Sequence, residues 1–362
     1  MKVPFVNIGQ QYINLRSQII KKFDQISKKG QYILGEELHL FEKEFSKYVG
    51  VKYSVGVGSG SDALTFSLLS LGIGKGDEVI IPVNSFVATA WTVANVGAKP
   101  VFCDVLDDFN INPFEIKKKI NKRTKAIMPV HLTGRMANMN EIIKIAKENK
   151  LFVIEDAAQA IGASYKNKKA GSFGNVGCFS LHPLKNLHVH GDGGVITTNN
   201  KKLYEFFLKI RNHGLKNRNE CEFWGYNSRL DNINAAIARI KLRYLTKWNM
   251  RFNEIAKKYS SKLNHKFIVP IDTIEYYSTY HRYIIMHENR NNLQKYLFRN
   301  NIETKINYPL PLHLHQASKN LGYKKGNFPK AEKQSSLILS IPIYAELSET
   351  KVDYIIDKMN SY

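Results

Sequence analysis

Short apolar runs alternate with helical patterns along this chain, and that alternation constrains the fold more than any other feature. The four clearest runs are Glu78–Pro82, Pro100–Cys103, Ala126–Val130 and Leu151–Ile154. A helical pattern at Met139–Glu148 lies between the last two of them. Alternation of this kind is typical of parallel strands that are joined by helices. The sequence therefore predicts an α/β fold in which a mostly parallel central sheet is flanked by helices.

Two chemically distinctive segments follow directly after predicted strands. The first is the turn Gly60-Ser61, which opens an apolar helix and offers free N–H groups, a hydroxyl and the helix dipole to a phosphate. Ser61 or Asp62 could instead serve only as the helix cap. The second is Asp156, which could pair with a protonated ring nitrogen of a cofactor or cap a helix. Ligands of parallel sheets lie beyond the carboxyl ends of the strands, so we expect one shared pocket.

The stretch from residue 177 to residue 198 carries the strongest chemical signal. Two β-prone pieces, Cys178–Leu181 and Gly194–Thr198, flank a turn-rich segment with a single lysine, Lys185. A lysine that such a loop partly removes from water has a lowered pKa, and its free amine is a nucleophile for carbonyl groups. The alternative is a solvated surface lysine, one of the 53 lysines and arginines in the chain. The neighbouring motifs favour the nucleophile.

Three motifs together resemble one enzyme family. They are EDAAQA at residues 155–160, SLHPLKN at 180–186 and GDGG at 191–194. The combination is similar to the DegT/DnrJ/EryC1/StrS family of nucleotide-sugar aminotransferases, which use pyridoxal phosphate (PLP), and the resemblance covers nearly the whole chain. It implies an aspartate-aminotransferase-like fold, that of fold type I PLP enzymes. A large PLP-binding domain with an N-terminal arm would span residues 1–247, and a smaller C-terminal α+β domain would span residues 248–362.

The resemblance also implies roles for individual residues, none of them as a metal ligand. Lys185 would bond to PLP and then act as general base and acid, and Asp156 would keep the pyridine nitrogen protonated. Gln159 would hydrogen-bond the ring hydroxyl. Phe86 would stack on the ring, with a core phenylalanine as the alternative. The phosphate would be held by Gly60, Ser61, Ser180 and Asn227.

For four further residues, the functional role that the resemblance implies has a structural alternative. Asn227 corresponds to a family asparagine that reaches the neighbouring subunit's PLP phosphate, which implies a homodimer with a shared active site; the alternative is a helix N-cap region. Tyr308 and His313 resemble a Tyr-Pro…Pro-x-His segment near the sugar, or form a structural loop. His131 lies either near the pocket or in the core.

The motif around Lys185 also bears on the reaction. Some relatives carry histidine at this position and act as sugar dehydratases, so Lys185 favours transamination. The form HPLKNL with GDGG is similar to members that act on dTDP-3-keto-6-deoxyhexoses. The expected reaction is amination at C3 by L-glutamate, with pyridoxamine phosphate (PMP) as the reaction intermediate, for surface-glycan (lipopolysaccharide) synthesis. The alternative is C4 amination of a UDP- or dTDP-4-keto-6-deoxy sugar.

A net charge of +22 could indicate binding to nucleic acid, and a non-enzymatic DNA-binding regulator is the alternative from another class. The lysines are scattered along the chain, often beside asparagine, so no nucleic-acid partner is expected. A basic surface also favours a phosphate-bearing substrate.

Three cysteines without metal-ligand spacing indicate free thiols in a reducing, cytoplasmic setting. No apolar run approaches the roughly 18 residues that a membrane span needs, so no membrane partner is expected.

Overall fold

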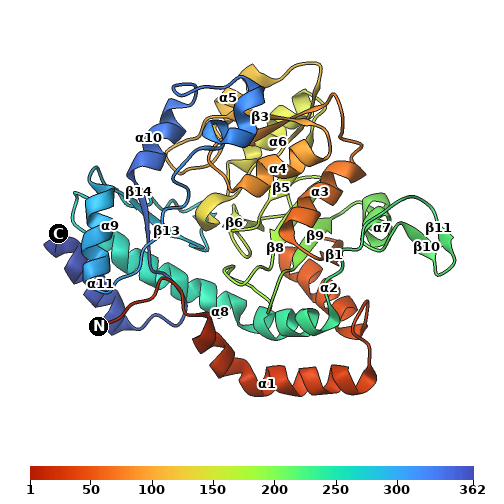
Figure 1. Cartoon of the computed structure of the whole chain (residues 1–362), viewed down its shortest axis with the longest axis horizontal. Coiled ribbons are helices and arrows are strands. Elements are labelled where there is room, and N and C mark those ends of the chain that lie inside the picture. The colour runs from red at the N-terminus through yellow and green to blue at the C-terminus, as the bar shows by residue number, and fades with distance from the viewer.

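The computed structural model describes all residues from 1 to 362, and a seven-stranded sheet forms its centre (Figure 1). Only β9 runs antiparallel to its neighbours; the remaining adjacent pairs are parallel. The prediction of a mostly parallel sheet is therefore confirmed. In spatial order the strands are β1 (Tyr53–Val57), β9 (Gly194–Thr198), β8 (Val176–Ser180), β5 (Phe152–Asp156), β4 (Thr124–Ile127), β2 (Glu78–Pro82) and β3 (Lys99–Cys103).

Helices cover both faces of the sheet, and neighbouring residues of one strand contribute to different cores. On β5, Val153 packs into the first core and Ile154 into the second, as the two-residue period of a strand requires. Parallel strands buried on both faces consist of continuous apolar runs, which explains the sequence pattern. The first face carries α2 (Glu36–Val49), α5 (Pro113–Lys119), α6 (Met139–Glu148) and α8 (Asn232–Lys262), and the second carries α3 (Gly60–Ser70), α4 (Val87–Asn95) and α7 (Lys201–Ile210).

A third hydrophobic core lies in the C-terminal part of the chain. It is built on the C-terminal half of α8, on the antiparallel pair β13 (Tyr283–Met286) and β14 (Ile338–Ile341), and on α9 (Arg290–Arg299) and α11 (Glu349–Ser361). The predicted boundary between residues 247 and 248 falls inside α8, between Leu245 of the first core and Phe252 of the third. Three later residues return to the second core, namely Leu312, Phe328 and Ala331.

The N-terminal helix α1 (Ile8–Lys29) lies along α8, as Figure 1 shows. Leu15 and Ile19 on its inner face pack against α8. Its outer face exposes Ile13, Ile20 and Phe23 to solvent. None of the helices combines the length and the apolar character that crossing a lipid bilayer requires.

The remaining elements are short. The polar segment 212–224, for which the sequence shows no period, contains a hairpin that projects from the body of the molecule (Figure 1). The cysteines are all free thiols. The short elements are β6 (Ser164–Tyr165), β7 (Lys168–Lys169), β10 (Leu215–Asn217), β11 (Glu220–Cys221), β12 (Tyr276–Tyr277), α10 (Pro329–Leu337) and the 3₁₀ helices Leu132–Gly134, Leu312–Leu314 and Gln316–Leu321.

Candidate active site

A cavity of about 360 Å³ lies where the strands β5 and β8 end. Its wall comes from the start of α3, from α4, from the ends of these strands, from the loop that carries Lys185, and from two segments of the C-terminal part. Eight of the ten predicted site residues line it: Gly60, Ser61, Phe86, Asp156, Gln159, Ser180, Lys185 and Tyr308. The carboxyl ends of the strands thus bring together residues that are far apart in the sequence.

The Lys185 segment is pinned to its surroundings through its backbone and its neighbours. The Lys185 N–H donates to the carbonyl of His182 at 2.8 Å, and the Lys185 carbonyl lies 3.0 Å from Nδ1 of His188. Because a carbonyl only accepts, Nδ1 of His188 carries the proton. Asn186 donates from Nδ2 to Oδ1 of Asn249 and to the carbonyl of Thr279. The loop therefore holds the lysine in a defined position.

The position of Lys185 lowers the pKa of its amine. Removal from water lowers its pKa to about 8; the charge of Asp156 acts against this and the charge of Arg282 reinforces it. At neutral pH a lysine with this pKa has a far larger uncharged fraction than a surface lysine. Its partial burial and its place in the cavity wall exclude the alternative of a solvated surface lysine.

Asp156 ends β5 with its carboxylate inside the protein, 5% exposed. It accepts a hydrogen bond from Oγ1 of Thr89 at 2.8 Å and one from the N–H of Ala158 at 3.2 Å. Burial raises its pKa, against the effect of these hydrogen bonds. No lysine, arginine or histidine forms an ion pair with it. A buried carboxylate without a cationic partner fits a protonated pyridine nitrogen.

The N-terminus of α3 faces the same cavity and keeps its second serine free. Ser59 caps the helix: its Oγ accepts from the N–H of Asp62 at 3.0 Å and donates to Oδ2 of Asp62 at 2.9 Å. Ser61 is therefore not the cap, and its hydroxyl lines the cavity. A Cβ on Gly60 would lie 2.8 Å from Cβ of Ser180, so only glycine allows this close approach. The arrangement suits a phosphate.

Gln159, Phe86 and Tyr308 form the wall beside Asp156. Gln159 accepts at Oε1 from the N–H of Thr133 at 2.9 Å and lies 3.4 Å from the Tyr308 hydroxyl. Phe86 is 53% exposed, which excludes the alternative of a core phenylalanine. Its ring centre lies 5.7 Å from that of Tyr308. Burial raises the pKa of Tyr308 to about 12, so the hydroxyl stays protonated.

Two predicted residues do not line the cavity. His313 is 2% exposed and is held elsewhere, with Nε2 3.0 Å from Oε1 of Glu332 and its ring edge against Phe328. Its neighbour Leu312 packs into the second core, and His313 therefore lies away from the cavity. Asn227 is exposed beside the hairpin, paired through its backbone with Asn212. The N-cap of α8 is Asp231, so Asn227 is not that cap.

His131 is completely buried and serves the structure. Its Nδ1 accepts from the N–H of Ala137 at 3.2 Å, so Nε2 carries the proton and donates to Glu155 at 2.9 Å. Among the residues of the cavity wall that the sequence did not predict as site residues are Thr89 and Arg282. Thr89 follows a strand in a helix without any motif, and Arg282 is one of many basic residues, so neither carries a sequence signal.

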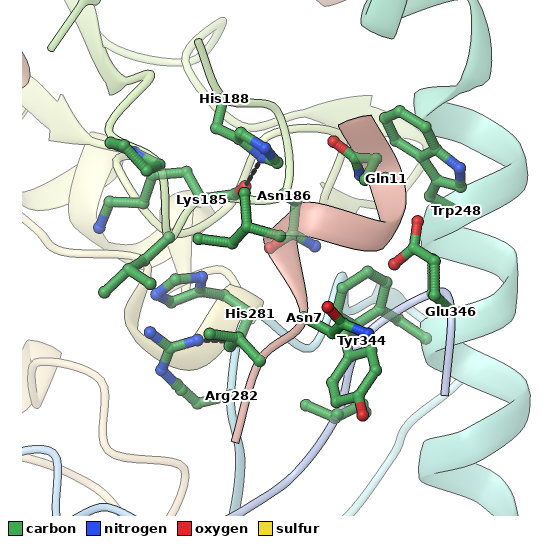
Figure 2. Close-up of a pocket in the computed structure, with 17 residues that line it drawn as sticks. Asn7, Gln11, Lys185, Asn186, His188, Trp248, His281, Arg282, Tyr344 and Glu346 are labelled. Carbon is green, nitrogen blue, oxygen red and sulfur yellow. Dashed lines mark hydrogen bonds between the residues drawn. The ribbon is translucent and has the colours of Figure 1, made fainter. Parts of the chain in front are cut away.

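A second, smaller hollow of about 50 Å³ lies on the other side of the Lys185 segment (Figure 2). The N-terminal arm contributes Asn7 and Gln11 to it, and the C-terminal part contributes Glu346. Figure 2 shows the Lys185 amine and the Arg282 guanidinium both pointing to the side opposite Glu346. The Lys185 segment therefore separates this hollow from the larger cavity.

A sheet of this topology, with a half-buried lysine and a buried carboxylate in one cavity at its carboxyl edge, defines the class of PLP-dependent aminotransferases. The sequence matches the DegT/DnrJ/EryC1/StrS aminotransferase family over residues 14–360. The chain belongs to this family, as the sequence motifs indicate.

Curated relatives match along their whole length. The chain is 40% identical to the "Pleiotropic regulatory protein" of Geobacillus stearothermophilus, covering 100% of the chain and 99% of the relative. It is also 40% identical to the dTDP-3-amino-3,6-dideoxy-alpha-D-galactopyranose transaminase of Aneurinibacillus thermoaerophilus, covering 99% of both. The chain is 37% identical to the UDP-N-acetyl-3-dehydro-alpha-D-glucosamine 3-aminotransferase of Acidithiobacillus ferrooxidans, and the match covers 97% of this chain and 95% of the relative.

Solved structures agree with the chain in fold. DesV of S. venezuelae, in complex with a ketimine intermediate, superimposes with a TM-score of 0.97 at 36% identity, covering 99% of this chain and 98% of that one. NtdA of Bacillus subtilis, with bound cofactor PMP, gives a TM-score of 0.92 at 30% identity, and the match covers 99% of this chain and 84% of NtdA. The predicted aspartate-aminotransferase-like fold is confirmed.

Proposed function

We propose that this enzyme transfers the amino group of L-glutamate to C3 of a dTDP-linked 3-keto-6-deoxyhexose and so forms a dTDP-3-amino-3,6-dideoxyhexose. The observation that carries the proposal is the lysine of lowered pKa that shares a cavity with a buried, unpaired carboxylate. The family membership supports amino transfer to nucleotide sugars. The Aneurinibacillus relative, a transaminase for a dTDP-3-amino sugar, supports the position C3 and the nucleotide dTDP.

The cofactor of this proposal is PLP, which supplies an electron sink during the reaction and holds the amino group as PMP between the two halves. Asp156 would keep the pyridine nitrogen protonated, and Phe86 would stack on the ring. Gln159 would donate from its Nε2 to the ring hydroxyl. The phosphate would be held by the N-terminus of α3 with Gly60, Ser61 and Ser180, and by Asn227 of the partner subunit.

Lys185 moves the protons of the reaction. Its free amine would accept the proton from the α-carbon of the amino donor and return it on the other side of the transferred nitrogen. A pKa of about 8 suits both acceptance and return near neutral pH, because the driving force is small in either direction. The hydrogen bonds of its loop would hold the amine in one position while it moves the proton.

The test is a product mass assay with PLP, L-glutamate and dTDP-4-keto-6-deoxyglucose, with and without a 3,4-keto-isomerase. We expect an amino sugar only in the tube that contains the isomerase, which would establish C3 amination. An amino sugar without the isomerase would establish C4 amination instead. Parallel tubes with UDP-linked keto sugars test the nucleotide, because the Acidithiobacillus relative is named for a UDP sugar.

A regulatory role is the second candidate, because one relative is named as a pleiotropic regulatory protein and the chain has a net charge of +22. Retardation of DNA at physiological salt by protein that forms no amino sugar would favour it. A regulator of this kind would not need a lysine of lowered pKa and a buried carboxylate in one cavity, which is why we prefer the enzyme.

A further inference from the structure

Lys241 on α8 is the only buried lysine of the chain, at 0% exposure. Its Nζ is enclosed by the protein and has no hydrogen-bond partner. Burial lowers its pKa to about 7, so a large share of the molecules carries this charge at neutral pH. A buried cation without a partner is costly to the fold, which points to a role in its surroundings.

Lys241 lies behind the segment that carries Lys185. Burial lowers the pKa of His188 and of His190 and raises that of Glu346, and the charge of Lys241 acts on all three groups. His188 and Glu346 line the small hollow of Figure 2, to which the N-terminal arm adds no charged side chain. Because such effects fall off with distance, Lys241 lies close to these three groups.

His188 connects this cluster to the Lys185 segment. It is 4% exposed, its Nδ1 donates to the carbonyl of Lys185 at 3.0 Å, and its Nε2 is buried without a partner. Burial, and then the charge of Lys241, lower the pKa of His188 to about 3, so the ring is neutral and carries one proton. With this proton on Nδ1 the ring holds the Lys185 carbonyl. With the proton on Nε2, a lone pair of Nδ1 would face the carbonyl oxygen.

The charge of Lys241 discriminates between these two tautomers. An ammonium group has three N–H donors and no acceptor. It therefore attracts the lone pair of Nε2 and opposes a proton at that atom. In the protein interior this preference acts over more than contact distance, because the surrounding dielectric is low.

We propose that Lys241 is a positioning residue for Lys185: its charge keeps the proton of His188 on Nδ1, and His188 then holds the Lys185 segment through its carbonyl. The proposal rests on the proposed function for the importance of Lys185, whereas the tautomer of His188 can be measured without it. Neither Lys241 nor His188 lines the active-site cavity, so both act through Lys185.

A double-mutant cycle tests whether Lys241 acts through His188. The amide nitrogen of asparagine is bonded to Cγ, as Nδ1 of histidine is, and always donates, so His188→Asn keeps the donor and has no tautomers. In the wild-type background, Lys241→Met should lower kcat about 3- to 10-fold, the worth of one hydrogen bond, with little change in the KM for L-glutamate. In the His188→Asn background the same change should have no further effect.

Lys169→Met is the matched control for the loss of a lysine. Burial lowers the pKa of Lys169 as well, but this lysine donates to the carbonyl of Tyr48 and lines neither the cavity nor the hollow. We expect its kcat to equal that of the wild type. Equal losses of kcat from Lys241→Met in both backgrounds would show that Lys241 acts by packing, and would overturn the proposal.

Nitrogen NMR of the apoenzyme provides a readout without turnover, with the His188 signals assigned through His188→Asn. At pH 6 we expect the proton on Nδ1 in the wild type and in Lys169→Met, and a shift toward Nε2 in Lys241→Met. In the wild type the Nδ1 form should decline as the pH rises through about 7, where Lys241 loses its charge, and this decline should be absent in Lys241→Met.

An Nδ1 proton that neither Lys241→Met nor the rise in pH displaces would overturn the proposal. The expected shifts in a protein that transfers no amino group would support the action of Lys241 on His188 and would overturn the proposed function alone.

Discussion

The amine of Lys185 titrates within reach of physiological pH. With a pKa of about 8, about one-tenth of the amine is uncharged at pH 7, against about one part in 3,000 for a lysine with the ordinary value of 10.5. Burial is the main cause, and the nearby positive charge of Arg282 adds to it. Both effects belong to the folded site, so the reactivity of this lysine is lost with the fold.

The first prediction concerns the capture of PLP by the apoenzyme. Because only the uncharged amine attacks the aldehyde, the rate should rise with pH around a midpoint near 8, as followed by cofactor absorbance. Lys185→Ala should capture no PLP covalently and should lose at least about 1,000-fold in turnover. Lys202→Ala, on the exposed face of α7, is the control. A midpoint near 10 would contradict the burial of the amine.

A second prediction concerns Asp156. Its pKa is raised in the fold, so the folded state holds the proton more tightly and stability from this group falls as the pH rises above about 4. At pH 7 to 8 the apoenzyme of Asp156→Asn should therefore unfold at the same or a higher temperature, with Thr89 still donating to the amide oxygen. Activity should fall about 100-fold or more. A large drop in the unfolding temperature would show that the carboxylate stabilises the fold.

At the scale of elements, the two serines at the start of α3 have different expected roles: Ser59 caps the helix, and Ser61 faces the cavity. Ser59→Ala removes the cap and should lower the free energy of unfolding by about 1 kcal/mol. Ser61→Ala should leave the unfolding temperature of the apoenzyme unchanged and weaken PLP binding by about tenfold. Thermal unfolding and PLP titration of both variants test this pair. If Ser61→Ala were the destabilising change, the assignment of the two serines would be reversed.

The elements and site residues that were predictable are those with local signals. Parallel strands covered on both faces are continuous apolar runs, and Lys185 and Asp156 lie in distinctive motifs. The β10–β11 hairpin was not predicted, because its exposed residues follow no period. Arg282 was missed because only tertiary packing brings it to the site, and for the same reason the position of His313 could not be read from its neighbours.

At the scale of the whole molecule, the single chain leaves apolar surface in solvent. The outer face of α1 exposes Ile13, Ile20 and Phe23, and Trp224 beside the hairpin is 94% exposed. Exposed apolar groups gathered on one element are typical of an interface. This surface supports the proposed homodimer.

A mixing experiment tests whether the sites are shared. Lys185→Ala and Asn227→Asp should each be inactive alone. After unfolding and refolding together, mixed dimers contain one site with native Lys185 and native Asn227 of the partner subunit. Random assortment should then restore about one quarter of the wild-type activity. No recovery, with mixed dimers verified by mass spectrometry, would place Asn227 outside the partner's site.

The helix α8 connects the first hydrophobic core to the third. Its 31 residues include no glycine or proline, span about 46 Å and belong to the first core at Leu245 and to the third at Phe252. A helix without glycine or proline has no residue at which a kink is expected, so we expect any relative movement of the first and third cores to arise outside α8. We therefore expect loops around the cavity, rather than α8, to move when substrates enter and leave.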